Sequence, residues 1–206
     1  MQFQYLTTLL ALTGAAIALP TAITPSKPLG KRLNTQVITA IMPSSASCSG
    51  RGDQCRTAAQ AAPLFEKAFS DYGIKTDVEK AGILALVAYE SLEMQYSKNL
   101  VNAAAGQGTS NMQMGTYNVM YANNIPELAA KSPTTSTVLD MVTADEYNFG
   151  TGPWFYSTQC TAAQSAASGG ADAWFAAYMS CVGVDVAAQP DRKTWFASAK
   201  TAFNLS

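Results

Sequence analysis

The sequence predicts an all-α fold, with at most a minor short strand element, arranged as a helical domain around one buried central helix. Apolar side chains recur at helical spacing in several segments, as in Leu64, Phe65, Ala68, Phe69 and Tyr72. The segment 81–89 carries no charged or strongly polar side chain, and a helix that is apolar on every side is buried. Alternating runs typical of strands are scarce.

The central helix is expected to begin after Thr76 and to end at or near Glu90. Thr76 followed three residues later by Glu79 forms a capping box, and acidic residues suit the positive end of a helix dipole. Another helix is expected over 56–72, with Gly73 as the left-handed residue that follows its last turn.

The other segments are assigned by the same patterns. Residues 33–42 alternate loosely and are interpreted as a short strand. Loops rich in Gly, Ser and Asn are expected over 103–116 and 148–157. The remaining helices are expected where apolar residues recur at helical spacing, over 117–122, 126–131, 134–147, 171–182 and 191–203.

The N-terminal segment has the features of a removable leader. An apolar stretch ends in Ala16-Ile17-Ala18, the small-x-small pattern that signal peptidase reads, so residues 1–18 are predicted to be a signal peptide. Residues 19–32 end in the dibasic pair Lys31-Arg32, which predicts a propeptide removed by a dibasic-specific protease. The alternative is a loose N-terminal arm with two chance basic residues.

The mature protein is therefore expected to span 33–206 as a single domain, secreted to the extracellular space. The leader is shorter than the about 20 apolar residues that cross a bilayer, and no later segment is longer, so no membrane anchor is predicted. Loss of Lys27, Lys31 and Arg32 leaves 10 of the 13 basic residues against 14 acidic ones. A nucleic-acid binder usually shows a basic excess, so no nucleic-acid partner is expected.

Four cysteines behind a signal peptide predict two disulfides. Three pairings are open, and the local one, Cys48 with Cys55 and Cys160 with Cys181, is favoured because each loop stays within one region. No metal site is predicted, because the chain has no His and no C-x-x-C pair. The lack of His also excludes Ser-His-Asp and Cys-His catalysis.

Glu90 is the leading candidate for chemistry. A carboxyl group at the end of an apolar helix loses water, which favours its neutral form, and the negative end of the helix dipole acts in the same direction. A neutral acid can donate a proton to a leaving oxygen. The alternative is a Glu that has simply reached the surface where the helix ends.

The residues after Glu90 carry a resemblance to a known family. Glu90-Ser91 is followed by the segment Gly106-Gln107-Gly108-Thr109-Ser110-Asn111-Met112-Gln113-Met114. This order resembles the lysozyme-like superfamily, especially goose-type lysozymes and lytic transglycosylases, in which a buried helix ends in a catalytic Glu-Ser and a Met-Gln turn lines the sugar cleft. The resemblance covers 76–124. The helix expected over 117–122 also resembles secreted lysozyme-like proteins of filamentous fungi.

The resemblance implies that Glu90 is the general acid. The residues that would position it or contact sugar are Ser91, Gln107, Asn111, Gln113, Tyr117 and Tyr121; ordinary core packing is the alternative for the two tyrosines. The protein is predicted to be a monomer, and acid chemistry by Glu90 would need no metal or organic cofactor.

One feature departs from goose-type lysozymes, which place an Asp between the Glu and the Met-Gln turn. Over 94–138 the only acidic residue is Glu127, so a two-carboxylate mechanism needs a distant partner. Asp145 and Glu146, before the Gly/Trp segment, are candidates for that second carboxylate, as are Glu93 and Asp140; a solvated helix end is the alternative. Lytic transglycosylases work with one Glu because the substrate's own hydroxyl attacks.

The resulting functional prediction is a secreted glycoside hydrolase or lytic transglycosylase. Its polysaccharide partner would be a β-1,4-linked N-acetylhexosamine polymer, either peptidoglycan or chitin, with Glu90 as the acid. The alternative prediction is a non-catalytic secreted glycan-binding or effector-like protein on the same scaffold.

Overall fold

The structure, a computed structural model, describes residues 32–101, 104–187 and 189–206. In these ranges the backbone is mostly helical, and β pairing is limited to isolated bridges at Lys98–Gly108 and Gly108–Gln113. The all-α prediction is confirmed. The predicted signal peptide (1–18) lies outside the described residues, as does the predicted propeptide (19–32) except for its last residue.

The chain forms a succession of short and medium helices. The α-helices are α1 (Thr35–Ile41), α2 (Ala58–Asp71), α3 (Asp77–Glu90), α4 (Gly115–Asn123), α5 (Pro126–Ala129), α6 (Val138–Val142), α7 (Asp145–Asn148), α8 (Thr151–Gln159), α9 (Thr161–Ser165), α10 (Ala171–Cys181) and α11 (Asp191–Phe203). Three 3₁₀ turns join them, η1 (Pro43–Ala46), η2 (Gly52–Gln54) and η3 (Ala166–Gly169).

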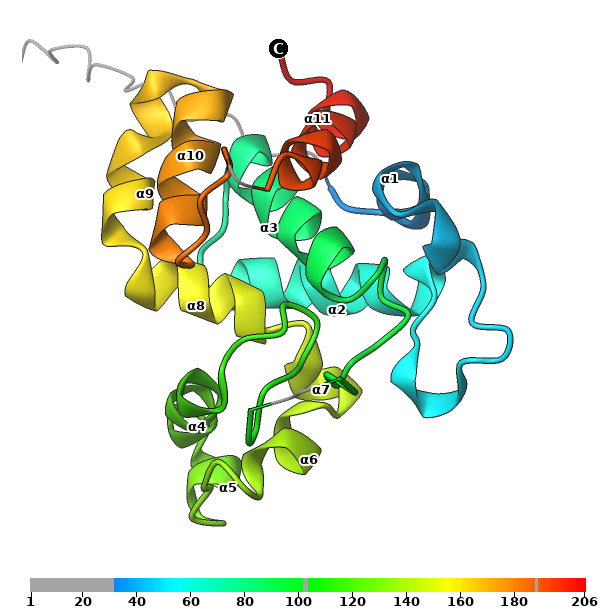
Figure 1. The fold of residues 1–206 in the computed structure, drawn as a ribbon, viewed down its shortest axis with the longest axis vertical. Helices are drawn as coiled ribbons and strands as arrows, with labels where there is room; N and C mark the ends of the chain where they lie inside the picture. The colour runs from blue at the N-terminus through cyan, green and yellow to red at the C-terminus, as the bar shows by residue number, and fades with distance from the viewer. Residues whose placement is uncertain (1–31, 102–103, 188) are drawn as a thin grey trace, which may run out of the picture.

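Helix α3 lies in the middle of the larger group of helices, and α4 to α7 form a smaller group below it (Figure 1). Helices α1, α8, α10 and α11 all pack on α3. Every residue from Lys80 to Ala88 is buried. The predicted buried central helix is therefore confirmed, and its surroundings bring α11, from the end of the chain, against the residues that close α3.

The sequence signals at both ends of α3 have the expected effect. The Thr76 side chain accepts the backbone N–H of Glu79 at 3.3 Å, and the Glu79 carboxylate accepts the backbone N–H of Thr76 at 2.9 Å. This reciprocal pair is the predicted capping box. At the other end Ser91 caps the helix, with its N–H on the carbonyl of Val87, so Glu90 is the last helical residue, as predicted.

We expect Thr76→Ala to lower the free energy of unfolding by about 1 kcal/mol, because one N–H of the first turn loses its acceptor. Urea denaturation monitored by circular dichroism measures the change. Thr201→Ala is the matched control, since Thr201 is an exposed threonine in the last turn of α11 whose hydroxyl donates to the carbonyl of Ala197 and caps no N–H. An equal loss in both variants would contradict the capping role.

The strand predicted over 33–42 is wrong, because this segment forms α1. Asn34 caps the helix by accepting the N–H of Val37 at 2.9 Å. Val37, Ile38 and Ile41 are all buried, and their spacing fits one face of a helix. A short apolar run fits both the two-residue period of a strand and the 3.6-residue period of a helix, and the Asn34 cap selects the helix.

Two other predictions also need correction. The loop predicted over 148–157 is mostly helix α8, in which Pro153 occupies the first turn, where its missing N–H has no helical partner to lose. The single helix predicted over 134–147 is instead two short helices, α6 and α7, separated by Ala144 in an extended conformation.

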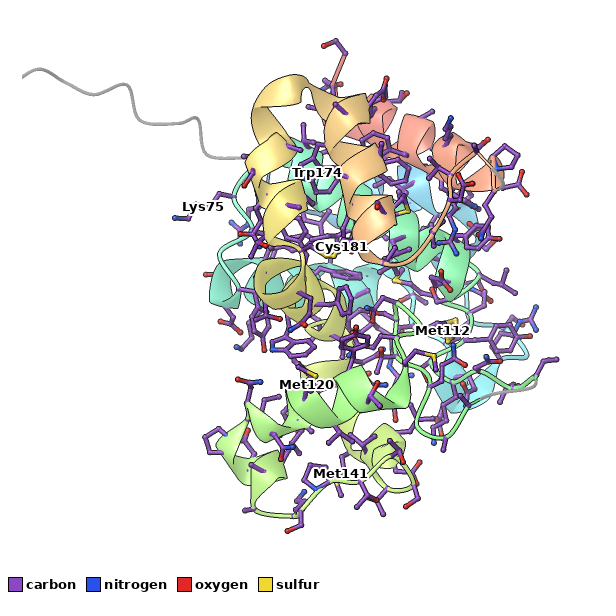
Figure 2. All side chains as sticks on the ribbon, turned by 60° about the vertical axis from the view of Figure 1, so that its left-hand side comes forward. Lys75, Met112, Met120, Met141, Trp174 and Cys181 are labelled. Carbon is purple, nitrogen blue, oxygen red and sulfur yellow. A yellow bond between two sulfur atoms is a disulfide. The ribbon has the colours of Figure 1, made fainter. Side chains whose placement is uncertain are left out.

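Both predicted disulfides are confirmed with the favoured pairing, Cys48–Cys55 and Cys160–Cys181. The second bridge joins the end of α8 to the end of α10 (Figure 2). It thereby fixes the start of the segment that leads to α11. No helix among the described residues is long and apolar enough to cross a membrane.

Candidate functional site

Glu90 forms an ion pair that the sequence did not predict. Its carboxylate, 24% exposed, accepts the Nη2 of Arg192 at 2.6 Å. The Arg192 side chain is only 7% exposed, its guanidinium lies over the ring of Tyr89 at 4.0 Å, and its Nε donates to Gln189 at 2.7 Å. Arg192 belongs to α11, so the packing of α11 on α3 creates this pair.

This contact changes the interpretation of Glu90. The expected neutral acid required a carboxyl group that had lost water and gained no partner. The structure instead supplies a guanidinium, and a salt bridge consists of a carboxylate anion and a cation. Glu90 is thus arranged as a fixed hydrogen-bond acceptor rather than as an isolated proton donor.

Two adjoining cavities meet at Glu90. The larger has a volume of about 420 Å³ and the smaller about 230 Å³, and Glu90, Gln107 and Met112 line both. The larger is completed by side chains of the segment after α3, namely Leu92, Tyr96, Lys98, Asn99, Leu100 and Val101. The smaller is completed by Leu86, Asn111, Gln113, Met114, Tyr117, Phe155, Val182 and Val184. Because the two cavities share these three residues, together they form one cleft.

Exposed apolar side chains gather at the walls of the cleft. Among the described residues, the large apolar side chains that remain exposed are Leu92 (63%), Leu100 (65%), Val101 (73%), Met114 (46%) and Met120 (44%). The first four all line the cleft, and Met120 on α4 does not. Figure 2 labels Met112 in the loop that forms the cleft and Met120 on the helix after it. Concentrated exposed apolar surface marks a binding site.

The floor of the smaller cavity is a buried network of polar side chains. Asn111 donates to Gln113 at 3.1 Å, and Gln113 donates to Asn118 at 2.7 Å. The side-chain oxygen of Asn111 accepts the hydroxyls of Thr109 at 2.9 Å and Thr151 at 2.7 Å. These hydrogen bonds fix the orientation of each of the three amide groups, so the floor is rigid before any ligand arrives.

Close backbone packing holds the same loop in place. A Cβ on Gly115 would lie 2.1 Å from the carbonyl oxygen of Ala105, and one on Gly106 would lie 2.5 Å from that of Thr135. Gly106 also has φ of +73°, which favours glycine. These glycines let the loop fold tightly enough for Gln107 to face Glu90 across both cavities.

A left-handed turn follows α3 directly. Leu92, Glu93 and Met94 have φ of 48°, 61° and 64°, and such values are costly for residues with a Cβ. The Ser91 hydroxyl accepts the N–H of Met94 at 2.9 Å, and the Glu93 carboxylate accepts the N–H and the hydroxyl of Ser44 at 2.6 and 2.8 Å. This strained turn carries Leu92 to the rim of the cleft.

The structure brings five predicted site residues together, because Glu90, Gln107, Asn111, Gln113 and Tyr117 all line the smaller cavity. Tyr117 is half-buried and packs edge-on against Phe155 with ring centroids 4.8 Å apart. The sequence placed these residues correctly relative to one another because they lie on α3 and on the loop and helix that follow it.

Ser91 and Tyr121 lie outside the cleft. Ser91 is fully buried, donates to the carbonyl of Val87 at 2.6 Å and holds the left-handed turn, so its role is structural. Tyr121 is 2% exposed and donates to the carbonyl of Tyr147 at 2.9 Å. Burial raises the pKa of the Tyr121 phenol far above its ordinary value, as expected for the core-packing alternative.

Asp145 and Glu146 also lie outside the cleft. Asp145 pairs with Arg56 at 2.5 Å, and both acids line a separate cavity of about 270 Å³. Loss of water, followed by the hydrogen bond to Glu146 and then its charge, raises the pKa of Tyr147 in this cavity to about 12. Glu93 bonds Ser44 and Asp140 pairs with Lys98, and neither lines the cleft. The expectation that one of these acids lies beside Glu90 as a second carboxylate is therefore wrong.

The sequence did not indicate Arg192, which pairs with Glu90 at the edge of the cleft, nor the cleft side chains from outside the Glu90–Tyr121 segment, which are Leu86, Phe155, Val182 and Val184. It also did not mark the cleft side chains between Leu92 and Val101. Val182 and Val184 follow α10 and line the smaller cavity, and Arg192 reaches Glu90 from 102 residues away. No local pattern announces such a tertiary contact. In the sequence, Arg192 is only a basic residue near the start of a predicted amphipathic helix, which gives no sign of a partner on α3.

Comparison with known proteins gives one informative similarity. No family model matches the chain, and no solved structure matches it. A Fusarium oxysporum (strain Fo5176) protein named bifunctional dioxygenase (DOX)-epoxy alcohol synthase (EAS) is 43% identical over 159 residues. The match covers 71% of this chain and 12% of the relative, so the chain spans about an eighth of that protein's length.

This similarity corrects the functional prediction. The relative is named a dioxygenase and epoxy alcohol synthase and not a glycosidase, so the prediction of a glycoside hydrolase, lytic transglycosylase or glycan-binding protein is wrong. The geometry is consistent with the correction. Glu90 is the one acidic residue among those that line the two cavities, and Arg192 already engages it.

Proposed function

We propose that the chain is a ligand-binding domain whose cleft takes an elongated, amphipathic organic molecule carrying hydroxyl or epoxide oxygens. The observation that carries the proposal is the gathering of four exposed apolar side chains around a fixed polar centre. Pockets for small molecules combine this kind of apolar lining with a few well-placed polar groups.

The polar groups of the cleft define where the ligand's oxygen atoms would lie. Oε1 of Glu90 is occupied by Arg192, and the remaining acceptor capacity of the carboxylate serves both cavities, so it suits a ligand hydroxyl. Lys98 and Asn99 line the larger cavity; the Lys98 ammonium pairs with Asp140 and the Asn99 amide nitrogen donates to Gln107, and each nitrogen has a further N–H for an ether or epoxide oxygen. The apolar skeleton would then lie against Leu92, Leu100 and Val101 of the same cavity.

The named relative supports this ligand class. By its name it makes an epoxy alcohol, a molecule with an epoxide and a hydroxyl on a carbon skeleton. Its two named activities belong to a protein about eight times longer than the match. The present chain has no His, and its four cysteines are all in disulfides, whereas oxygen chemistry on iron commonly uses imidazole or thiolate ligands. A binding role beside such chemistry fits these residues best.

The proposal predicts that apolar wall residues carry affinity. We expect Leu100→Ser and Val101→Ser each to weaken binding of an epoxidised long-chain alcohol about five- to tenfold, since each removes about 1 kcal/mol of apolar contact. Isothermal titration calorimetry measures the change. Met120→Ser is the matched control, because Met120 is exposed to a similar degree as Met114 but lies outside the cleft.

Two further ligands sharpen the same titration. The parent long-chain alcohol without the epoxide should bind more weakly, because the donors of Lys98 and Asn99 lose their partner. A chito-oligosaccharide should not bind. The proposal fails if the epoxy alcohol gives no heat of binding, or if Met120→Ser weakens it as much as Leu100→Ser does.

We also propose that the protein is secreted. The two disulfides support this, because such bonds persist in oxidising compartments, and the predicted signal peptide supplies the route. Expression of the full chain in a fungal host, followed by analysis of the culture medium, tests it. Retention of the protein inside the cells would contradict the proposal.

The resemblance to the lysozyme-like superfamily stays a proposal about the scaffold alone. It is supported by the central helix that ends in Glu90-Ser91 and by the loop at Gln107–Gln113 that meets it across the cleft. An experimentally determined structure with a different order of helices around α3 would end this comparison.

A further inference from the structure

Leu33, the residue directly after the dibasic pair, is firmly docked. Its side chain is 4% exposed and belongs to the hydrophobic core, and its backbone N–H donates to Oε1 of Glu66. Arg32, immediately before it, is exposed. The chain therefore changes from exposed to buried at the Arg32–Leu33 peptide bond, which is the bond that a protease specific for Lys31-Arg32 would cut.

The acceptor at this point is a carboxylate, and it has more capacity than a peptide N–H uses. Glu66 lies on α2, and its side chain is 30% exposed. The Nζ of Lys80, a buried residue of α3, is 3.9 Å from the same Oε1. In the uncut chain the partner on the Leu33 side is an uncharged amide with one hydrogen. A partly buried carboxylate interacts more strongly with a charged donor than with a neutral one.

We propose that Glu66 is the receptor for the α-ammonium group that hydrolysis of the Arg32–Leu33 bond creates. Water adds across the amide: its hydroxyl completes the carboxyl group of Arg32, and the nitrogen of Leu33 leaves as an amine and takes up protons. The new ammonium group then occupies the position of the former amide and forms an ion pair with Glu66. This assigns a processing site and a second function for it, which is to lock the mature N-terminus onto the domain.

The lock acts on an element that supports the cleft. Helix α1 begins at Thr35, two residues after Leu33, and it packs on α2, α3 and α11. Because Leu33 is buried, the N-terminal segment must open locally before a protease can cut the bond. The charge made by the cut then favours its return, so processing shifts the N-terminal segment toward the docked state.

The experiment uses the full chain before and after treatment with a dibasic-specific endoprotease. N-terminal sequencing of the product should begin at Leu33. At about pH 6, where an α-amino group is protonated, the melting temperature should rise by about 2–4 °C on cleavage, the shift that an ion pair of about 1 kcal/mol gives in a domain of this size. A product that starts elsewhere, or an unchanged melting temperature, would overturn the proposal.

Two controls separate the ion pair from the mere loss of the leader. In Glu66→Gln, cleavage should leave the melting temperature unchanged, because the comparison is made within the variant and does not depend on its basal stability. Selective acetylation of the new α-amine in the cut wild-type protein should also cancel the rise. A rise that persists in both controls would assign the stabilisation to leader removal and overturn the role of Glu66.

Discussion

Replacement of Glu90 by Leu is expected to lower the free energy of unfolding by about 3 kcal/mol, because it leaves the guanidinium of a buried arginine without its counter-charge. Arg192 is 7% exposed, and its Nη1 is buried without a hydrogen-bond partner among the described residues. The Nη2 bond to Glu90 is therefore a main compensation for burying this charge. Guanidinium chloride denaturation measures the loss.

The double variant Glu90→Leu with Arg192→Met is expected to recover most of that loss, because no unpaired charge then remains in the interior. Lys67→Met is the matched control for an exposed ion pair, because the Lys67 side chain that pairs with Asp71 is 72% exposed. It should lower the free energy of unfolding by less than about 1 kcal/mol. If the loss in the double variant equals the sum of the losses measured for Glu90→Leu and Arg192→Met singly, the two residues are not coupled, and Glu90 does not compensate the buried charge of Arg192.

Replacement of Gly82 by Ala is expected to cost about 3 kcal/mol and to lower the melting temperature by about 10 °C. A Cβ at this position would lie 2.1 Å from Cζ3 and 2.5 Å from Cη2 of Trp174. The indole has little freedom to move away, because it is fully buried, donates to the hydroxyl of Tyr156 at 3.0 Å and lies beside the ring of Tyr178. Differential scanning calorimetry tests the expectation.

Gly152→Ala is the matched control for this substitution. Gly152 is also buried and helical, but its nearest neighbour to an added Cβ is Ile83 at 3.6 Å, an ordinary contact. The alanine should therefore leave stability nearly unchanged or raise it slightly. Equal destabilisation by both substitutions would mean that helix geometry, and not the contact of α3 with Trp174, limits residue 82.

The parts of the fold that the sequence predicted well are those where local signals and burial agree. The capping box at Thr76 and the uninterrupted apolar run after it define α3 without tertiary information. The errors arose where one pattern fits two structures. Residues 33–42 suit a strand or a helix until the Asn34 cap is recognised, and the glycines around Pro153 suggested a loop although proline is well tolerated in the first turn of α8.

The candidate site divides in the same way. Glu90, Gln107, Asn111 and Gln113 could be grouped from the sequence because short-range geometry brings the end of α3 to the following loop. Arg192 could not be, because an ion pair between α3 and α11 depends on how helices 102 residues apart pack. Its presence changes Glu90 from an expected proton donor to a fixed acceptor, and this is where the glycosidase interpretation loses its physical basis.

The function prediction failed for a related reason. Short motifs such as Glu-Ser and Met-Gln describe a scaffold, and one scaffold can serve unrelated functions. The apolar character of the cleft, which points to a different ligand class, depends on the exposure of Leu100 and Val101. Exposure is a property of the folded chain, and no pattern in the sequence distinguishes these two residues from core residues.

The position of a bound epoxy alcohol tests the central claim most directly. Amide chemical shifts of isotope-labelled protein, recorded during titration with an epoxidised long-chain alcohol, locate the ligand residue by residue. The account predicts that the largest changes centre on Glu90, Gln107, Met112 and the segment from Leu92 to Val101. Changes centred instead on the separate cavity beside Tyr147, or no changes at saturating ligand, would contradict it.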